Sequence, residues 1–94
     1  MREKAFEEKI KKYIEDLGGY WVKFHGNMYT RKGVPDILAC INGKFFGIEV
    51  KGDGGVTSEL QKYEVKKINA SGGVGIIVYP KDFESLKGLL NSAV

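Results

Sequence analysis

Hydrophobic residues near the N-terminus recur at the spacing of a helix. The repeat predicts a helix over about residues 5–17, with one apolar face turned toward the rest of the fold. The residues of this face are Phe6, Ile10, Tyr13, Ile14 and Leu17. Gly18 and Gly19 follow directly and are expected to end the helix, because glycine readily takes the left-handed conformation common at helix C-termini.

The next part of the chain has the pattern of β-strands. Tyr20–Phe24 is aromatic and β-branched, which predicts a first strand, and the polar, glycine-containing stretch after it predicts a loop. Asp36–Ile41 and Lys44–Lys51 are predicted as the second and third strands. Between them lies Asn42-Gly43, a dipeptide that favours the two-residue hairpin turn. The sequence therefore predicts an antiparallel hairpin.

The second half of the chain returns to helix, strand and helix. Thr57-Ser58 can cap a helix that runs to about Ala70 and ends at Gly72-Gly73. Val74–Tyr79 is a continuous apolar run, typical of a strand buried on both faces. A short C-terminal helix is predicted from the apolar residues Phe83, Leu86, Leu89 and Leu90. The order α-β-β-β-α-β-α predicts one α/β domain over residues 1–94, with helices packed against a mixed central sheet.

Composition limits the class of protein. The chain has 94 residues, of which 43% are hydrophobic and 29% charged, as expected of one small globular domain. No apolar run approaches the ~20 residues that span a bilayer, and the charged N-terminus does not resemble a signal peptide. We therefore expect a cytoplasmic protein with no membrane partner. The single Cys40 lies in an apolar strand and is predicted to be a core residue, as is Trp21.

Three charged residues are predicted to converge at the ends of the hairpin strands. Side chains alternate along a strand, so Glu49 and Lys51 point to the same side. With Asn42-Gly43 as the turn, Asp36 lies opposite Glu49. Directly opposed carboxylates repel, and a bound divalent cation removes that repulsion. Two carboxylates beside an ammonium group are what a metal-dependent phosphodiesterase requires.

Each of these motifs is weak when taken alone. A Pro-Asp dipeptide is common at turns, and a Glu-x-Lys pair usually lies on a solvated strand face. The net charge of +3 is compatible with nucleic-acid binding without being diagnostic of it. Basic residues flank the proposed acidic centre, where they either attract phosphates or serve only as solubilising loop charges. These residues are Lys23, His25, Arg31 and Lys32.

The ordered motifs resemble those of the PD-(D/E)xK nuclease superfamily. The resemblance is carried by residues 33–38, by the hairpin, and by Gly47-Ile48-Glu49-Val50-Lys51. Within the superfamily the chain resembles stand-alone VRR-NUC domains and, more distantly, archaeal Holliday-junction resolvases. Residues 57–62 followed by Gly72-Gly73-Val74 are similar to the second helix and last strand of VRR-NUC domains. The likeness extends from about Ala5 to Tyr79. It implies a restriction-endonuclease-like fold and Mg²⁺-dependent DNA cleavage, with Mn²⁺ as a substitute.

The resemblance also implies roles for individual residues. Asp36 and Glu49 would bind one or two cations, and Lys51 would orient and activate the attacking water. A glutamate on the first helix joins the metal site in this family. Glu7 flanks the apolar face whereas Glu8 lies almost opposite it, so Glu7 is favoured as that ligand; the alternative is a solvent-exposed glutamate stabilised by the helix dipole.

The resemblance and the sequence also suggest roles for residues around the proposed metal site. Gln61 is placed near the active site by the resemblance, but Ser58-x-x-Gln61 also fits a capping box, and the two roles compete for one side chain. The backbone carbonyl of Val50 is implied as a metal ligand. Tyr29, Arg31 and Lys32 are expected to contact DNA. His25 is expected to make a phosphate contact or a structural contact rather than to act as a general base.

The expected substrate is branched DNA. Resolving a four-way junction needs two symmetric cuts, and a 94-residue domain with one site makes one, so a homodimer is expected. The alternatives are a flap nuclease or exonuclease on the same fold, and a non-catalytic DNA-binding module. No recognition-helix or zinc-finger motif is present, so recognition of DNA shape and backbone is expected.

Overall fold

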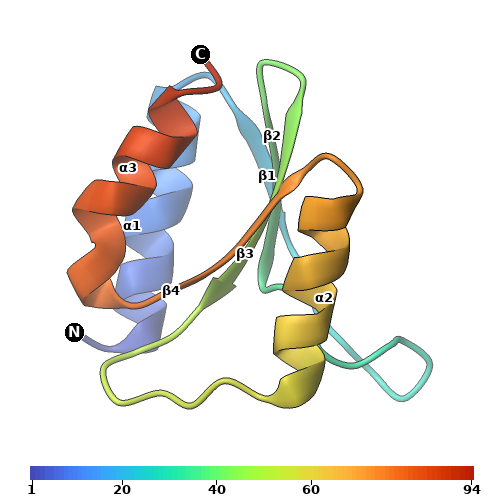
Figure 1. Cartoon of the computed structure of the whole chain (residues 1–94). Coiled ribbons are helices and arrows are strands. Elements are labelled where there is room, and N and C mark those ends of the chain that lie inside the picture. Colours follow the sequence, from blue (N-terminus) through green and yellow to red (C-terminus); the bar gives the residue numbers. More distant parts are fainter.

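The computed structural model describes residues 1–94 as a four-stranded mixed sheet between helices (Figure 1). The sheet order is β1-β2-β3-β4, with β3 and β4 parallel and the other neighbours antiparallel. The α/β class and the predicted order of elements are confirmed. The elements are α1 (Glu3–Asp16), β1 (Tyr20–Lys23), β2 (Ile37–Ile41), β3 (Lys44–Val50), α2 (Glu59–Ala70), β4 (Val74–Val78), the 3-10 helix η1 (Pro80–Asp82) and α3 (Phe83–Asn91).

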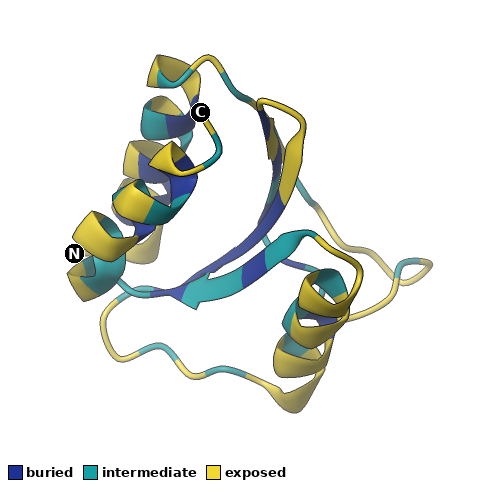
Figure 2. Cartoon of the chain, turned by 45° about the horizontal axis from the view of Figure 1, so that its top comes forward, coloured by how far each residue is buried: buried dark blue, intermediate teal, exposed yellow.

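Helices cover the two faces of the sheet unequally. Figure 1 shows α1 and α3 side by side on one face and α2 on the other. The main core lies between the sheet and helices α1 and α3, where Figure 2 shows buried residues on both the helices and the strands. Side chains alternate along β2 and β3, and these strands turn most of their apolar side chains to that face. Its twelve buried residues are Phe6, Ile10, Ile14, Ile37, Ala39, Ile41, Phe46, Ile48, Val50, Val78, Leu86 and Leu90.

The hairpin has the predicted turn and register. Asn42 and Gly43 have φ angles of 50° and 82°, so both central residues are in the left-handed region that the two-residue hairpin turn requires. Ile41 pairs with Lys44 and Ile37 with Ile48. Continuing this register by one residue brings Asp36 opposite Glu49.

Two burial predictions are wrong. β4 is an edge strand with a partner only on the β3 side, so Gly75 and Val78 are buried while its other residues are half-buried. Cys40 is exposed. It lies on the face of β2 opposite the core, and α2 packs against β3 and β4 without covering the outer face of β1 and β2. Trp21 is half-buried at the edge of the core, and its Nε1 donates to Glu15 Oε2 at 2.8 Å.

The helices are too short or too polar to cross a membrane.

Candidate functional site

The hairpin brings two carboxyl groups together at the end opposite its turn. Asp36 lies just before β2, and Glu49 is the penultimate residue of β3. The Val50 backbone N–H donates a hydrogen bond of 2.8 Å to Asp36 Oδ2, which fixes the Asp36 side chain against the neighbouring strand. The side chain of Val50 lies in the core, so its backbone alone faces the site. A metal-ligand role for the Val50 carbonyl stays a prediction.

Glu49 is the side chain whose pKa is shifted furthest from its ordinary value. It is only 3% exposed. Burial, followed by the negative charge of Asp36, raises the pKa of Glu49 to about 7, although Lys51 acts in the opposite direction. The pair therefore holds a proton near neutral pH when no other cation is present. A site that favours a positive charge between two carboxylates fits a hard divalent cation.

Gln61 connects this carboxylate to Lys51 and to the start of α2. Its Nε2 donates to Glu49 Oε2 at 2.9 Å, and its Oε1 accepts from Lys51 Nζ at 2.9 Å. The same Oε1 accepts from the Ser58 backbone N–H at 2.9 Å, and Ser58 Oγ accepts from the Gln61 N–H at 3.1 Å. The expectation that capping and site contacts compete is thus wrong. One amide makes both, because the capping box itself aims Gln61 at the strand end.

The ammonium group of Lys51 has two partners within the protein, which leaves one of its N–H donors unused. Its Nζ lies 2.9 Å from Gln61 Oε1 and 3.2 Å from Glu49 Oε2. An ammonium group has three N–H donors, so one remains for a water or a phosphate oxygen. The loop after β3 closes over its stem: a Cβ added to Gly55 would lie 3.2 Å from Lys51 Cβ. Tyr79 Oη donates to the Gly55 carbonyl at 2.9 Å and anchors this loop.

Glu7 faces the sheet, as predicted, while Glu8 is exposed. Glu7 Oε1 lies 2.7 Å from Lys23 Nζ, and Glu7 Oε2 lies 2.9 Å from Lys11 Nζ. Burial alone would raise the pKa of Glu7, but the two ammonium groups outweigh it and lower that pKa below its ordinary value. Glu7 is therefore ionised and paired at neutral pH.

The metal-ligand set is only partly assembled. No group of three or more histidine, cysteine, aspartate and glutamate side chains is arranged to hold a metal ion. Asp36 and Glu49 lie together, whereas Glu7 is occupied by lysines. Two carboxylates suit a hard cation whose other ligands are water and substrate, as is usual for Mg²⁺. A ligand role for Glu7 stays a prediction.

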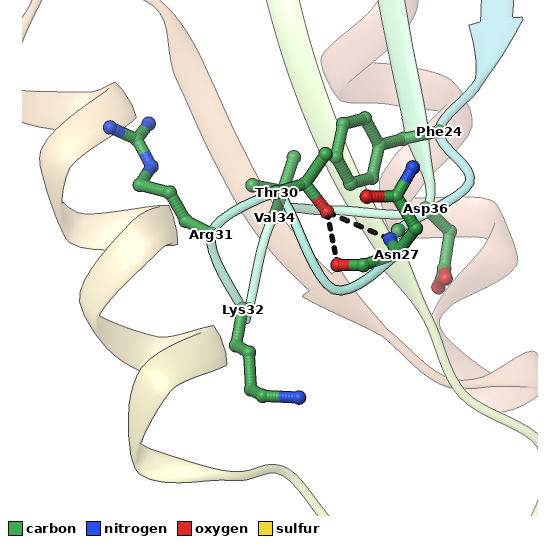
Figure 3. A pocket seen from close by; sticks show the side chains of 9 residues that line it. Phe24, Asn27, Thr30, Arg31, Lys32, Val34 and Asp36 are labelled. Carbon is green, nitrogen blue, oxygen red and sulfur yellow. Dashed lines mark hydrogen bonds between the residues drawn. The ribbon is translucent and has the colours of Figure 1, made fainter.

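A polar pocket of about 320 Å³ adjoins Asp36 (Figure 3). Asn27 and Thr30 close the loop around it, since Thr30 Oγ1 accepts from the Asn27 N–H at 2.9 Å and donates to the Asn27 carbonyl at 3.0 Å. The pocket is lined by Phe24, Gly26, Asn27, Thr30, Arg31, Lys32, Gly33, Val34 and Asp36.

The predicted DNA contacts separate into two groups. His25, Tyr29 and Lys32 are exposed on the loop. Lys23 instead lies inside the site, and Arg31 extends away from Asp36, where its Nη2 pairs with the buried Glu64 at 3.2 Å (Figure 3). A DNA-contact role for all five residues stays a prediction.

Sequence reasoning missed Lys11 and Glu64 and the position of Lys23. For Lys11, the only local signal was its spacing of four residues from Glu7 on one helix, which allows the two side chains to pair. Nothing local connects Arg31 to Glu64, 33 residues apart.

The sequence matches no protein-family model, and no curated protein is significantly similar to it.

Proposed function

We propose that this protein is a Mg²⁺-dependent endonuclease that hydrolyses phosphodiester bonds of DNA, on a fold of the PD-(D/E)xK type. The observation that carries the proposal is the convergence of Asp36, Glu49 and Lys51 at the end of one hairpin. The resemblance to VRR-NUC domains supports the same activity, through motifs that fall at these positions.

Asp36 and Glu49 would hold the cation, because their oxygens are hard ligands and their mutual repulsion is relieved by it. When bound, a divalent cation supplies Lewis-acid polarisation of a phosphate oxygen and lowers the pKa of a bound water. Lys51 would direct its remaining N–H toward the attacking water or a phosphate oxygen. Gln61 keeps the ammonium of Lys51 beside Glu49, so that donor is already oriented before substrate enters.

Substrate binding would rest on the phosphate backbone. The exposed loop beside Asp36 carries His25, Tyr29 and Lys32, and Lys32 makes no ion pair within the chain. The adjoining pocket is open and polar, which suits a sugar-phosphate segment. We propose branched DNA as the substrate class, with four-way junctions cut by a homodimer.

The test is cleavage of end-labelled four-way junction, flap and linear duplex DNA by purified protein, with Mg²⁺, with Mn²⁺ and with excess chelator. The proposal expects paired nicks in the junction with either metal and none with chelator. Preferential cutting of flaps or of free ends would indicate a flap nuclease or exonuclease on this fold. Tight binding of DNA without cleavage under every metal condition would indicate a DNA-binding module, and robust cleavage in chelator would exclude the metal mechanism.

A further inference from the structure

Lys23 places a positive charge between two of the three acidic residues of the site. Its Nζ lies 2.7 Å from Glu7 Oε1 and 3.7 Å from Asp36 Oδ1. The side chain is 26% exposed, so this is a largely enclosed contact rather than a surface ion pair. The ammonium of Lys23 thus occupies the space between helix α1 and the start of β2, where a cation shared by Glu7 and Asp36 would have to lie.

Both carboxylate oxygens of Glu7 are already engaged. Oε1 contacts Lys23, and Oε2 lies 2.9 Å from Lys11 Nζ. The Lys11 side chain is 13% exposed, and its Nζ lies 4.7 Å from the centre of the Trp21 ring. A divalent ion bound to Glu7 would have to displace an ammonium group that is partly desolvated and held on several sides, which is costly.

The charges of the site balance without a second metal ion. Among the enclosed side chains, three carboxylates, of Glu7, Asp36 and Glu49, face three ammonium groups, of Lys11, Lys23 and Lys51. Lys11 also pairs with Glu8, whose side chain is exposed to solvent. One divalent cation together with one phosphodiester leaves a single excess positive charge. A second divalent cation would leave three such charges in an enclosed site, where uncompensated charge is unfavourable.

We propose that Lys23 is a built-in substitute for a second metal ion. The site binds one divalent cation, at Asp36 and Glu49. The ammonium group of Lys23 lies between the carboxylates of Glu7 and Asp36 and fixes their positions relative to each other. In this arrangement Lys23 is a positioning residue and Glu7 is its anchor rather than a metal ligand. The inference rests on the proposed metal-dependent function and specifies the number of ions at that site.

The experiment counts bound Mn²⁺ per chain by the electron paramagnetic resonance signal of free Mn²⁺, without DNA and independently of cleavage. We expect one ion for the wild type and one for Lys23→Arg, which keeps the charge. Lys23→Met removes the ammonium and should admit a second ion, and the double variant Lys23→Met/Glu7→Gln should return to one. Cooperative thermal unfolding in chelator establishes that each variant is folded.

Glu7→Gln alone provides a second measurement that does not depend on the Lys23→Met protein. The proposal expects it to bind one Mn²⁺ with an affinity within about tenfold of the wild type. A larger loss of affinity would make Glu7 a ligand and overturn the proposal, as would two ions in the wild type or one ion in folded Lys23→Met; the nuclease proposal would survive all three results. No Mn²⁺ binding by the wild type would overturn both.

Discussion

Glu49 is a buried carboxyl group with a second carboxyl group beside it, and this makes its protonation part of the stability of the metal-free protein. Its pKa is about 7 in the fold and 4.5 when unperturbed. Because the folded-state value is the higher one, the bound proton stabilises the fold fully below pH 4.5, and that contribution disappears as the pH rises through 7. A cation bound at Asp36 and Glu49 would replace this proton.

We therefore expect the metal-free protein to lose stability between pH 5.5 and 8.5. The loss attributable to Glu49 is on the order of 2 kcal/mol, from about 1.36 kcal/mol per pKa unit. Urea unfolding in chelator measures it, and Glu49→Gln is the matched control, since an amide of the same size does not titrate. Equal pH slopes for the wild type and Glu49→Gln would contradict the raised pKa.

Lys51 and Asp36 lie at strand ends outside the apolar core, so their side chains can be changed without opening that core. We expect Lys51→Ala and Asp36→Asn to abolish cleavage of junction DNA while the thermal transition and DNA binding persist. Lys62→Ala is the control, because Lys62 pairs only with Glu59 on the exposed side of α2. Cleavage by either site variant within about tenfold of the wild type, roughly 1.4 kcal/mol in barrier, would show that the site is misassigned.

The first turn of helix α2 has two structural roles: it caps the helix and it contacts the candidate site. Ser58 and Gln61 close the helix N-terminus, and the Gln61 side chain also holds Lys51 and Glu49. The side-chain amide of Gln61 thus connects the N-terminus of α2 to the C-terminal end of β3.

Two substitutions separate these roles. Ser58→Ala removes the Oγ acceptor and should cost about 1 kcal/mol of stability with little effect on cleavage. Gln61→Ala should cost a similar amount but also lower the cleavage rate more than about tenfold, because Lys51 and Glu49 both lose a partner. Urea unfolding and junction cleavage, measured on both variants, check this; equal activity losses would mean that only the cap matters.

The loop before β2 is fitted against α2 at Gly33. Its φ is +89°, and a Cβ there would lie 2.5 Å from the Leu60 carbonyl oxygen. Gly33→Ala should therefore destabilise the protein through both backbone strain and this clash. Gly54→Ala isolates the first effect, because Gly54 has a similar φ of +78° and nothing within 4 Å of the added Cβ. We expect the larger loss in unfolding free energy for Gly33→Ala; equal losses would contradict the close fit of loop and helix.

At the scale of the whole molecule, the sheet leaves one apolar area uncovered. Tyr20, Val22, Leu38, Cys40 and Phe45 line a shallow hollow of about 270 Å³ on the outer side of β1 to β3, which also borders Ala39, a residue of the core. None of these side chains is charged, which disfavours a DNA partner. β1 is also an edge strand, with unpaired backbone groups on its outer side. A second copy of the chain can cover the area and that edge together.

We expect sedimentation to show a dimer at micromolar concentration. Tyr20→Glu should yield monomer, because Tyr20 is 69% exposed in this area and a buried unpaired charge is unfavourable. Val56→Glu is the control, since Val56 is 84% exposed in the loop between β3 and α2. A monomeric wild type would overturn the dimer, and a dimeric Tyr20→Glu would place its interface elsewhere.

The parts of the site that could be predicted are those determined by neighbouring residues. Asn42-Gly43 dictates a turn type, and the turn dictates the register that aligns Asp36 with Glu49. The exposure of Cys40 could not be predicted, because alternation along a strand identifies two faces without saying which one a helix covers. The place of Lys23 depends on the packing of α1 against β1, which no local pattern encodes.

The hairpin also limits how the length of this chain can vary. Glu49 and Lys51 reach the site because Ile48 and Val50 point the other way, into the core. Deleting one residue within β3 would exchange these two sets, placing isoleucine and valine in the site and two charges in the core. We expect natural insertions and deletions in this hairpin to add or remove two residues within the strand pair, or to be confined to the turn at Asn42-Gly43. Either change leaves the two charged residues on the same face of the strand.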